Sequence, residues 1–188
     1  MNTQSTYWFW ESELSPIECQ QIINSHFIES NSKQGVLRGR DGEMGVDSER
    51  RITLVSWVAP GNPIFNKIHD YISTANKDAG WNYDITGMED VQIGKYQDGG
   101  HYCWHADIGP PCAQNFQRKL SCSVQLSDES EYEGGDLIFQ DMGGDEYTAP
   151  RKQGSIVVFP STLRHKVTPV TSGTRFSAVA WMRGPAFK

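Results

Sequence analysis

The chain has 188 residues, of which 37% are apolar, and its formal net charge is −6. That length and composition allow one sizeable hydrophobic core and exclude a disordered protein. The negative charge argues against a broad nucleic-acid-binding face, and no run reaches the roughly 18 apolar residues of a membrane span, so neither function class is predicted.

The first residues and the cysteines both favour a cytoplasmic protein. Residues 1–6 lack the basic and apolar regions of a signal peptide. The four cysteines form no Cys-x-x-Cys pair and no zinc-like spacing, so reduced thiols are expected. Two local basic groups, Arg38-Gly39-Arg40 and Arg50-Arg51, are expected to be solvated loop charges.

Residues 1–80 predict two helices, a loop and a strand. Ser15-Pro16-Ile17-Glu18 has the pattern of a capping box, which predicts a helix that begins there and extends to about residue 27. Residues 29–50 are polar and glycine-rich, so they predict a long loop, a candidate lid. The β-branched run 51–58 predicts a strand, and Asn62-Pro63 predicts the start of a second, amphipathic helix.

After residue 80 the sequence predicts short strands separated by Gly, Asp and Pro clusters. They are expected at 88–96, 101–107, 118–127, 135–140, 154–159, 163–169 and 174–182. Two helices followed by these strands predict a mainly β (α+β) fold with an antiparallel double-sheet or jelly-roll core and a helical layer outside it. We expect one domain over 1–188, in which 1–80 supply helical support and a loop and 81–188 form the jelly-roll catalytic core.

The segment 101–107 contains a candidate metal-binding pair. Residues i and i+2 of a strand project from the same face, so His105 and Asp107 are expected to bind one ion together. His165, arriving on another strand, completes two histidines and one carboxylate, a ligand set that holds Fe(II) and leaves positions open for substrates. His101 would stand too far along the same strand to share the ion, so it is interpreted as a rim residue.

A candidate carboxylate-binding residue lies on the next predicted strand. Arg175 follows the third ligand by ten residues, and its guanidinium offers a forked donor for a carboxylate. Ser177 shares its strand face. Together with the three metal-ligand candidates, this arrangement predicts an oxygenase.

These residues belong to a longer pattern. Tyr96, Gly99, Tyr102, His105 and Asp107 fit Tyr-x-x-Gly-x-x-Tyr-x-x-His-x-Asp. The pattern continues with Glu133-Gly134-Gly135-Asp136-Leu137 and with the run from Gly154 through His165 to Arg175. With these motifs the chain resembles the Fe(II)/2-oxoglutarate-dependent dioxygenases, and among them the PKHD-type, prolyl/lysyl hydroxylase-like branch. The resemblance covers about residues 88–182, whereas 1–87 match only in general layout.

The resemblance implies a double-stranded β-helix core with flanking N-terminal helices, and it implies roles for the site residues. His105, Asp107 and His165 would bind Fe(II), which 2-oxoglutarate would chelate, and Arg175 would pair with the distal carboxylate of 2-oxoglutarate. A hydroxyl is expected beside Arg175. Tyr96 is the first candidate and Ser177 the second, and Ser121 or Ser123 also qualify because some relatives place a tyrosine on their strand.

The implied reaction is hydroxylation of a C–H bond with succinate and CO₂ as co-products and with ascorbate as a candidate reductant. A prolyl or other amino-acid residue in a peptide or protein is the first substrate class, and a small molecule is the second. A non-enzymatic jelly-roll binding module with a vestigial metal site is a third hypothesis. A nucleic-acid demethylase is disfavoured because relatives of that kind carry a second arginine where this chain has Trp181.

Overall fold

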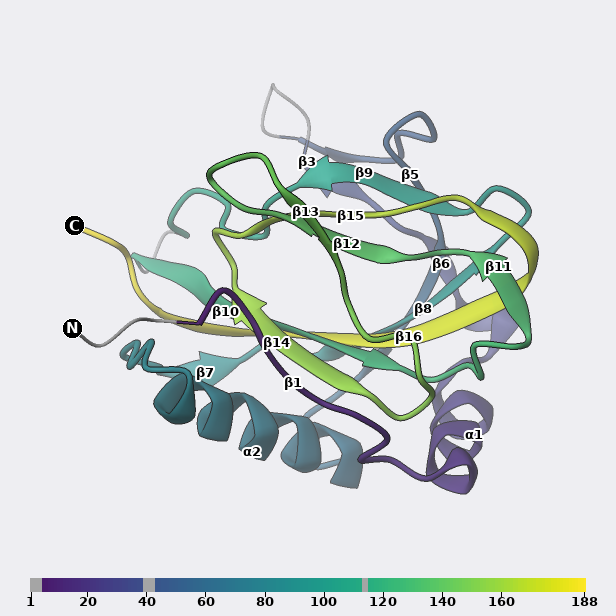
Figure 1. Cartoon of the computed structure of the whole chain (residues 1–188), viewed down its shortest axis with the longest axis horizontal. Coiled ribbons are helices and arrows are strands. Elements are labelled where there is room, and N and C mark those ends of the chain that lie inside the picture. The colour runs from purple at the N-terminus through teal and green to yellow at the C-terminus, as the bar shows by residue number, and fades with distance from the viewer. Residues whose placement is uncertain (1–4, 39–42, 113–114) are drawn as a thin grey trace.

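The chain folds into three layers: two antiparallel sheets and, against the outer face of the larger sheet, two helices (Figure 1). A computed structural model describes residues 5–38, 43–112 and 115–188. This arrangement confirms the predicted mainly β fold with a jelly-roll core and a helical layer.

The larger sheet has a long central strand. In order it contains β1 (Trp8–Trp10), β14 (Ile156–Pro160), β10 (Phe116–Gln125), β16 (Val170–Pro185), β8 (Val91–Gln97), β6 (Leu54–Val58) and β2 (Lys33–Gln34). Two further strands pair with β16, namely β7 (Gly87–Met88) and β11 (Tyr132–Gly134). The smaller sheet contains β13 (Glu146–Thr148), β12 (Leu137–Gln140), β15 (Arg164–Val167), β9 (His101–His105) and β5 (Arg51–Ile52).

The two helices begin where the sequence predicts. In α1 (Pro16–His26) the Ser15 side chain accepts from the Glu18 backbone N–H while the Glu18 carboxylate accepts from the Ser15 backbone N–H, which is a complete capping box. In α2 (Pro63–Asp78) the Asn62 side chain caps the first turn. Its apolar stripe is buried against the larger sheet: Ile64, Ile68, Ile72 and Ala75. Within the described residues neither helix is long and apolar enough to cross a membrane.

Alternation along the central strands separates the core from the functional cavity. On β10, Leu120, Cys122 and Val124 pack toward the helices in the main hydrophobic core. Side chains alternate between the two faces of a strand, so the intervening Ser121, Ser123 and Gln125 face the smaller sheet. The same alternation on β16 places small apolar residues against the helices and Arg175 and Ser177 between the sheets.

The predicted loop 29–50 contains more structure than expected. It includes a 3₁₀ turn, η1 (Glu29–Asn31), the strand β2, and the paired strands β3 (Leu37–Arg38) and β4 (Met44–Gly45). These strands have only two residues each, too short to give a periodic signal. Residues 39–42, which include part of the Arg38-Gly39-Arg40 group, lie outside the described residues.

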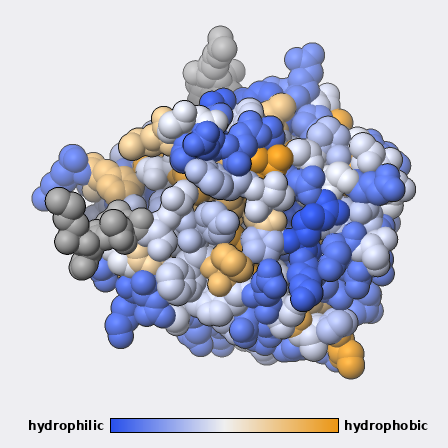
Figure 2. All heavy atoms as spheres, viewed as in Figure 1, coloured by the Kyte–Doolittle hydropathy of each residue, from blue (hydrophilic) through white to orange (hydrophobic). Residues whose placement is uncertain are grey.

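In Figure 2 the visible face is mainly hydrophilic, with apolar residues in small separate areas.

Candidate metal centre and adjoining cavity

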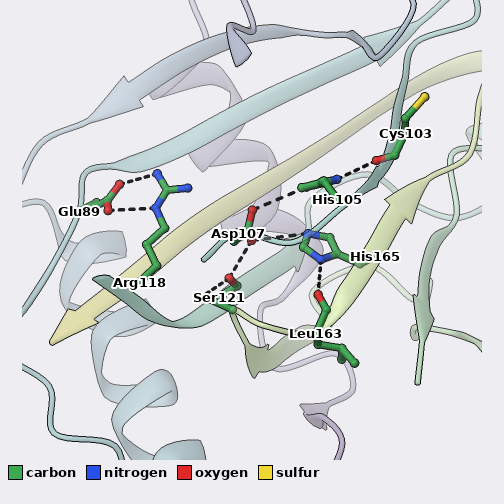
Figure 3. Close-up of polar contacts among 9 residues, drawn as sticks. Glu89, Cys103, His105, Asp107, Arg118, Ser121, Leu163 and His165 are labelled. Carbon is green, nitrogen blue, oxygen red and sulfur yellow. Dashed lines mark hydrogen bonds and ion pairs between the residues drawn. The ribbon is translucent and has the colours of Figure 1, made fainter. Parts of the chain in front are cut away.

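Two neighbouring residues, His105 and Asp107, converge between the sheets with His165 from a distant part of the sequence (Figure 3). His105 is the last residue of β9, and His165 lies opposite it on the neighbouring strand β15. Asp107 follows two residues after His105. Each of the three offers one ligand atom, and these atoms all lie within 4.8 Å of one another.

The position of Asp107 corrects one expectation, because the predicted strand 101–107 ends at His105. The Ser161 carbonyl accepts hydrogen bonds from the backbone N–H groups of both Asp107, at 2.9 Å, and Ile108, at 3.0 Å, so the chain turns away from β9. Ser121 on β10 donates its hydroxyl to Asp107 Oδ2 at 2.7 Å. Asp107 therefore reaches the site from a turn held by the larger sheet, not from a shared strand face.

Hydrogen bonds to the backbone orient both imidazoles. His105 Nδ1 lies 2.8 Å from the Cys103 carbonyl oxygen, and His165 Nδ1 lies 2.9 Å from that of Leu163. A carbonyl oxygen only accepts, so each Nδ1 carries a proton and donates, and each Nε2 is directed toward the Asp107 carboxylate. Backbone hydrogen bonds of this kind fix the tautomer and the ring orientation of metal-binding histidines.

Burial and neighbouring charges keep the cluster ready to bind a cation. Burial, with a further electrostatic contribution from the neighbouring His165, lowers the pKa of His105 to about 3, so its imidazole is neutral at neutral pH. Burial alone would raise the pKa of Asp107, but the facing His165 and His105 and the nearby Arg118 outweigh it and hold that pKa below its ordinary value. The carboxylate is therefore ionised.

The donor set fits Fe(II). Asp107 Oδ1 lies 3.6 Å from His105 Nε2, and Asp107 Oδ2 lies 3.5 Å from His165 Nε2. Both separations exceed ordinary hydrogen-bond lengths and leave room for an ion between the ligand atoms. Two imidazoles and one carboxylate are the facial ligand set of non-haem Fe(II) oxygenases. These three residues would hold the metal.

Arg175 presents a buried guanidinium to the same cavity, at a distance from the candidate metal ligands along the chain. Its side chain is buried, with 2% of the residue exposed, and Nε and Nη2 both donate to Gln125 Oε1 at 3.2 and 2.9 Å. Nη1 is buried and has no hydrogen-bond partner among the described residues. A buried guanidinium N–H without an acceptor is costly, so Nη1 fits the distal carboxylate of 2-oxoglutarate.

An amide oxygen accepts the hydrogen bonds of Arg175, and the candidate hydroxyls Tyr96 and Ser177 line the same cavity. Tyr96 lies beside Arg175 in the sheet, and its ring centroid is 5.4 Å from the guanidinium carbon. Within the described part of the chain, neither Tyr96 nor Ser177 hydrogen-bonds to Arg175, and Ser121 instead orients Asp107. The role of Gln125 was not predicted from the sequence. Its position on β10, in register with Ser177 and in phase with Ser121 and Ser123, is the signal that would have found it.

One cavity of about 580 Å³ joins these groups. His105, Asp107, His165 and Arg175 line it together with Tyr96 and Ser177. His101 does not line this cavity; its Nε2 lies 3.2 Å from the Glu49 carbonyl oxygen. Toward solvent the lining includes three exposed apolar side chains, namely Val36, Met44 and Trp57.

Charged side chains form another part of the cavity wall. Arg118 donates from Nε and Nη2 to the two carboxylate oxygens of Glu89, at 3.0 and 2.6 Å (Figure 3). The Arg118 guanidinium also lies over the Trp181 ring, 3.9 Å from its centroid. Arg51 is buried in the wall as well, which corrects its assignment as a solvated loop charge, whereas Arg50 is exposed as expected.

Comparison with known proteins places the fold and motifs in a family. The family model described as the 2OG-Fe(II) oxygenase superfamily matches residues 91–183. A PKHD-type hydroxylase of Synechococcus sp. strain CC9605 is 40% identical over 98 residues, which are 52% of this chain and 43% of that protein. A PKHD-type hydroxylase of Aliarcobacter butzleri is 28% identical over 174 residues, which are 88% of this chain and 72% of that protein. The Synechococcus match thus spans less than half of that relative.

A solved structure shares the architecture over almost the whole chain. The viral collagen prolyl hydroxylase of Paramecium bursaria Chlorella virus-1, in its 2OG complex, superimposes with a TM-score of 0.71. The match covers 96% of this chain and 97% of the viral one, at 23% sequence identity. At that identity the likeness shows the fold alone.

Proposed function

Since the chain belongs to the 2OG-Fe(II) oxygenase superfamily, we propose that it is an Fe(II)- and 2-oxoglutarate-dependent dioxygenase that hydroxylates a prolyl or other amino-acid residue of a peptide or protein. Succinate and CO₂ are the co-products. The observation that carries the proposal is the placement of the His105, Asp107 and His165 ligand atoms in the same cavity as the unpartnered Nη1 of Arg175.

The chain's own residues bind and orient the reactants. Iron held by His105, Asp107 and His165 would supply O₂ activation coupled to the oxidative decarboxylation of 2-oxoglutarate. Ser121 fixes the Asp107 carboxylate, and the Cys103 and Leu163 carbonyls fix the two imidazoles. Arg175, held by Gln125, presents Nη1 to the distal carboxylate, while Tyr96 and Ser177 form the adjoining wall. Ascorbate as a reductant is part of the proposal.

The mouth of the cavity favours a peptide over a small molecule. Exposed Val36, Met44 and Trp57 line it, and such a rim offers apolar contacts to a chain that extends beyond the cavity. The viral structural neighbour is a collagen prolyl hydroxylase by name, which supports the same substrate class by analogy. Residues 1–188 are proposed to form one catalytic domain because α2 packs on β10 and β14 of the core. The four free thiols favour a cytoplasmic location.

The test measures succinate formation from 2-oxoglutarate by the Fe(II)-loaded chain, together with the products of a pool of proline-containing peptides. We expect succinate, and a peptide product heavier by one oxygen atom. His105→Ala should reduce succinate formation at least about a hundredfold, because loss of a metal ligand exceeds the 10–100-fold effect of losing an outer contact.

His101→Ala is the matched control, since this histidine is on the same strand but bonds to backbone oxygens away from the metal centre. It should retain the wild-type rate of succinate formation. Equal rates in wild type and His105→Ala would disprove the iron assignment. Succinate without any oxygenated peptide would contradict the peptide substrate and favour a small-molecule hydroxylase. Absence of both iron binding and succinate would favour the non-enzymatic binding module.

A further inference from the structure

A second buried arginine faces the same cavity and is not used by the proposed reaction. Arg51 lies on β5, the edge strand of the smaller sheet, and only 8% of the residue is exposed. Its Nε is buried without a hydrogen-bond partner among the described residues. Within residues 5–38, 43–112 and 115–188, no carboxylate forms an ion pair with it.

The guanidinium of Arg51 has a close-fitting position. Its central carbon lies 4.8 Å from the centroid of the Tyr102 ring, and that ring stacks on the His105 imidazole at 3.5 Å. On another side is Gly35, where a Cβ atom would lie 2.6 Å from Arg51 Nε and 2.7 Å from Cζ. Arg51 is therefore packed between a glycine and an aromatic ring that itself contacts a metal-ligand candidate.

The other charged side chains of the cavity wall that are not exposed have hydrogen-bond partners, whereas among the described residues Arg51 Nε has none. Arg118 is bound by Glu89, Arg175 by Gln125, and Asp107 by Ser121. Of the charged side chains that line the cavity, six are basic and only two are acidic, although the whole chain has a net charge of −6. A buried cation without an acceptor is unfavourable in the free protein, so its retention points to an anionic ligand.

We propose that Arg51 binds a carboxylate of the substrate and so selects acidic substrates for hydroxylation. This inference rests on the proposed function and adds the substrate class. The carboxylate belongs to an acidic residue near the target residue in a peptide, or to the free C-terminus of the target amino acid. Arg51 on the smaller sheet and Arg175 on the larger one thus serve two different carboxylates, that of the substrate and that of 2-oxoglutarate.

The test compares matched acidic and amide probes. The first comparison uses proline-centred peptides with Asp or Glu beside the proline against otherwise identical peptides with Asn or Gln at that position. The second comparison uses N-acetylproline against N-acetylprolinamide. Dissociation constants are measured by calorimetry on the full chain loaded with 2-oxoglutarate and with Zn(II) in place of Fe(II), so that no turnover intervenes. In wild type at least one acidic probe should bind about tenfold more tightly than its amide.

Arg51→Met should bring that ratio to within about twofold while keeping a side chain of similar length over Tyr102. Gly35→Ala should also reduce the ratio, because the added methyl group displaces the guanidinium while Arg51 itself is retained. Arg50→Met, at the exposed neighbouring position, should keep the wild-type ratio. The melting temperature of Arg51→Met should equal or exceed that of wild type, since the substitution removes an unpaired buried charge.

Three results of the binding and melting measurements would overturn the inference. One is that the wild-type protein shows no preference for the acidic probes, because both probes of each pair bind with equal dissociation constants or neither binds. Another is an equal loss of the acid preference in Arg50→Met. That loss would show that the overall positive electrostatic potential of the cavity, and not Arg51, causes the preference. The third is an unchanged ratio in Arg51→Met with a lower melting temperature, which would make Arg51 structural. Succinate release by wild type without peptide is measured in parallel. If succinate forms but no preference exists, only the role of Arg51 fails; if no succinate forms, the proposed function fails.

The probe pair that shows the preference identifies the source of the carboxylate. A preference among the peptides places it on an acidic side chain, and one for N-acetylproline over its amide places it on the target amino acid. Either result supports the role of Arg51. The Michaelis constant for 2-oxoglutarate should be unchanged by Arg51→Met. A tenfold rise in that constant would instead make Arg51 a residue of the cofactor site and contradict the proposal.

Discussion

Arg175 and Arg51 are both buried and both face the cavity, but the chain holds them differently. Arg175 lies on the central strand β16, and two of its nitrogens donate to one amide oxygen of Gln125. Arg51 lies on the edge strand β5, where a tyrosine ring and a glycine confine it. Among the described residues its Nε donates no hydrogen bond. The first guanidinium is preoriented before a ligand arrives, and the second is positioned mainly by packing.

The contrast separates a constant ligand from a variable one. A co-substrate used in every turnover gains from a rigid, preoriented donor, because little ordering remains for the binding step. A substrate carboxylate that differs in reach from one target to another gains from a donor whose hydrogen bonds are uncommitted. Substitutions that act on one arginine and leave the other in place therefore show whether the two ends of the cavity are independent.

The largest effect is expected at the preoriented end. Arg175→Met removes the donor for the distal carboxylate of 2-oxoglutarate, so the Michaelis constant for 2-oxoglutarate should rise by about a hundredfold in a succinate assay, the scale of a lost charge-assisted pair. Binding of the acidic and amide probes should keep its wild-type ratio. An unchanged Michaelis constant for 2-oxoglutarate would contradict the assignment of Arg175.

Gln125 should have a smaller effect, as a positioning residue for Arg175. Gln125→Leu removes the acceptor for two guanidinium N–H groups, so the Michaelis constant for 2-oxoglutarate should rise about tenfold and the free energy of unfolding should fall by about 1–3 kcal/mol. Gln125→Glu separates the two effects, because it restores an acceptor but neutralises the charge of Arg175. We expect it to recover stability in urea unfolding without recovering 2-oxoglutarate affinity. Recovery of both would make Gln125 merely structural.

Substitution of Gly135 should have a still smaller effect on the Michaelis constant for 2-oxoglutarate, because an added side chain would occupy the space next to Arg175. A Cβ atom at Gly135 would lie 2.9 Å from Arg175 Cδ, and its φ of +64° strains any other residue. Gly135→Ala should therefore lower the melting temperature by a few degrees and raise the Michaelis constant for 2-oxoglutarate about threefold. Gly144→Ala is the control, since Gly144 has a φ of +93° but nothing within 4 Å of the added atom. Equal effects of both variants on that constant would show that backbone strain alone is responsible.

The sequence predicts the preoriented end of the cavity better than the other. His105, Asp107, His165 and Arg175 lie in motifs of fixed spacing, and alternation along β9, β15 and β16 directs the two histidines and the arginine into the cavity between the sheets. Gln125 carries no such motif. Its role depends on the pairing of β10 with β16, a contact between residues 50 positions apart, which local periodicity does not encode.

Burial is the property that the sequence predicts least well at the edge of the smaller sheet. Arg50-Arg51 reads as a surface pair, yet β5 pairs with β9 and places Arg51 over Tyr102 while Arg50 stays exposed. The exit of Asp107 from the strand also depends on a distant partner, the Ser161 carbonyl. By contrast, the helix starts at Ser15 and Asn62 depend on nearby residues, and both were predicted correctly.

The capping box of α1 should give the smallest effect and leave both arginines untouched. The Glu18 carboxylate of this box accepts hydrogen bonds from Lys67 and from Ser15. These bonds, with that of Lys67 the larger, lower the pKa of Glu18 from 4.5 to about 2. A carboxylate with a lowered folded-state pKa stabilises the protein above pH 4.5, and this contribution is lost as the pH falls toward 2. Because the Glu18 side chain is 44% exposed, solvent screening limits the effect of Glu18→Gln at pH 7 to about 0.5 kcal/mol. Urea unfolding should show this difference shrinking between pH 7 and pH 3, with 2-oxoglutarate affinity unchanged; a difference that is constant with pH would show that the charge of Glu18 does not contribute.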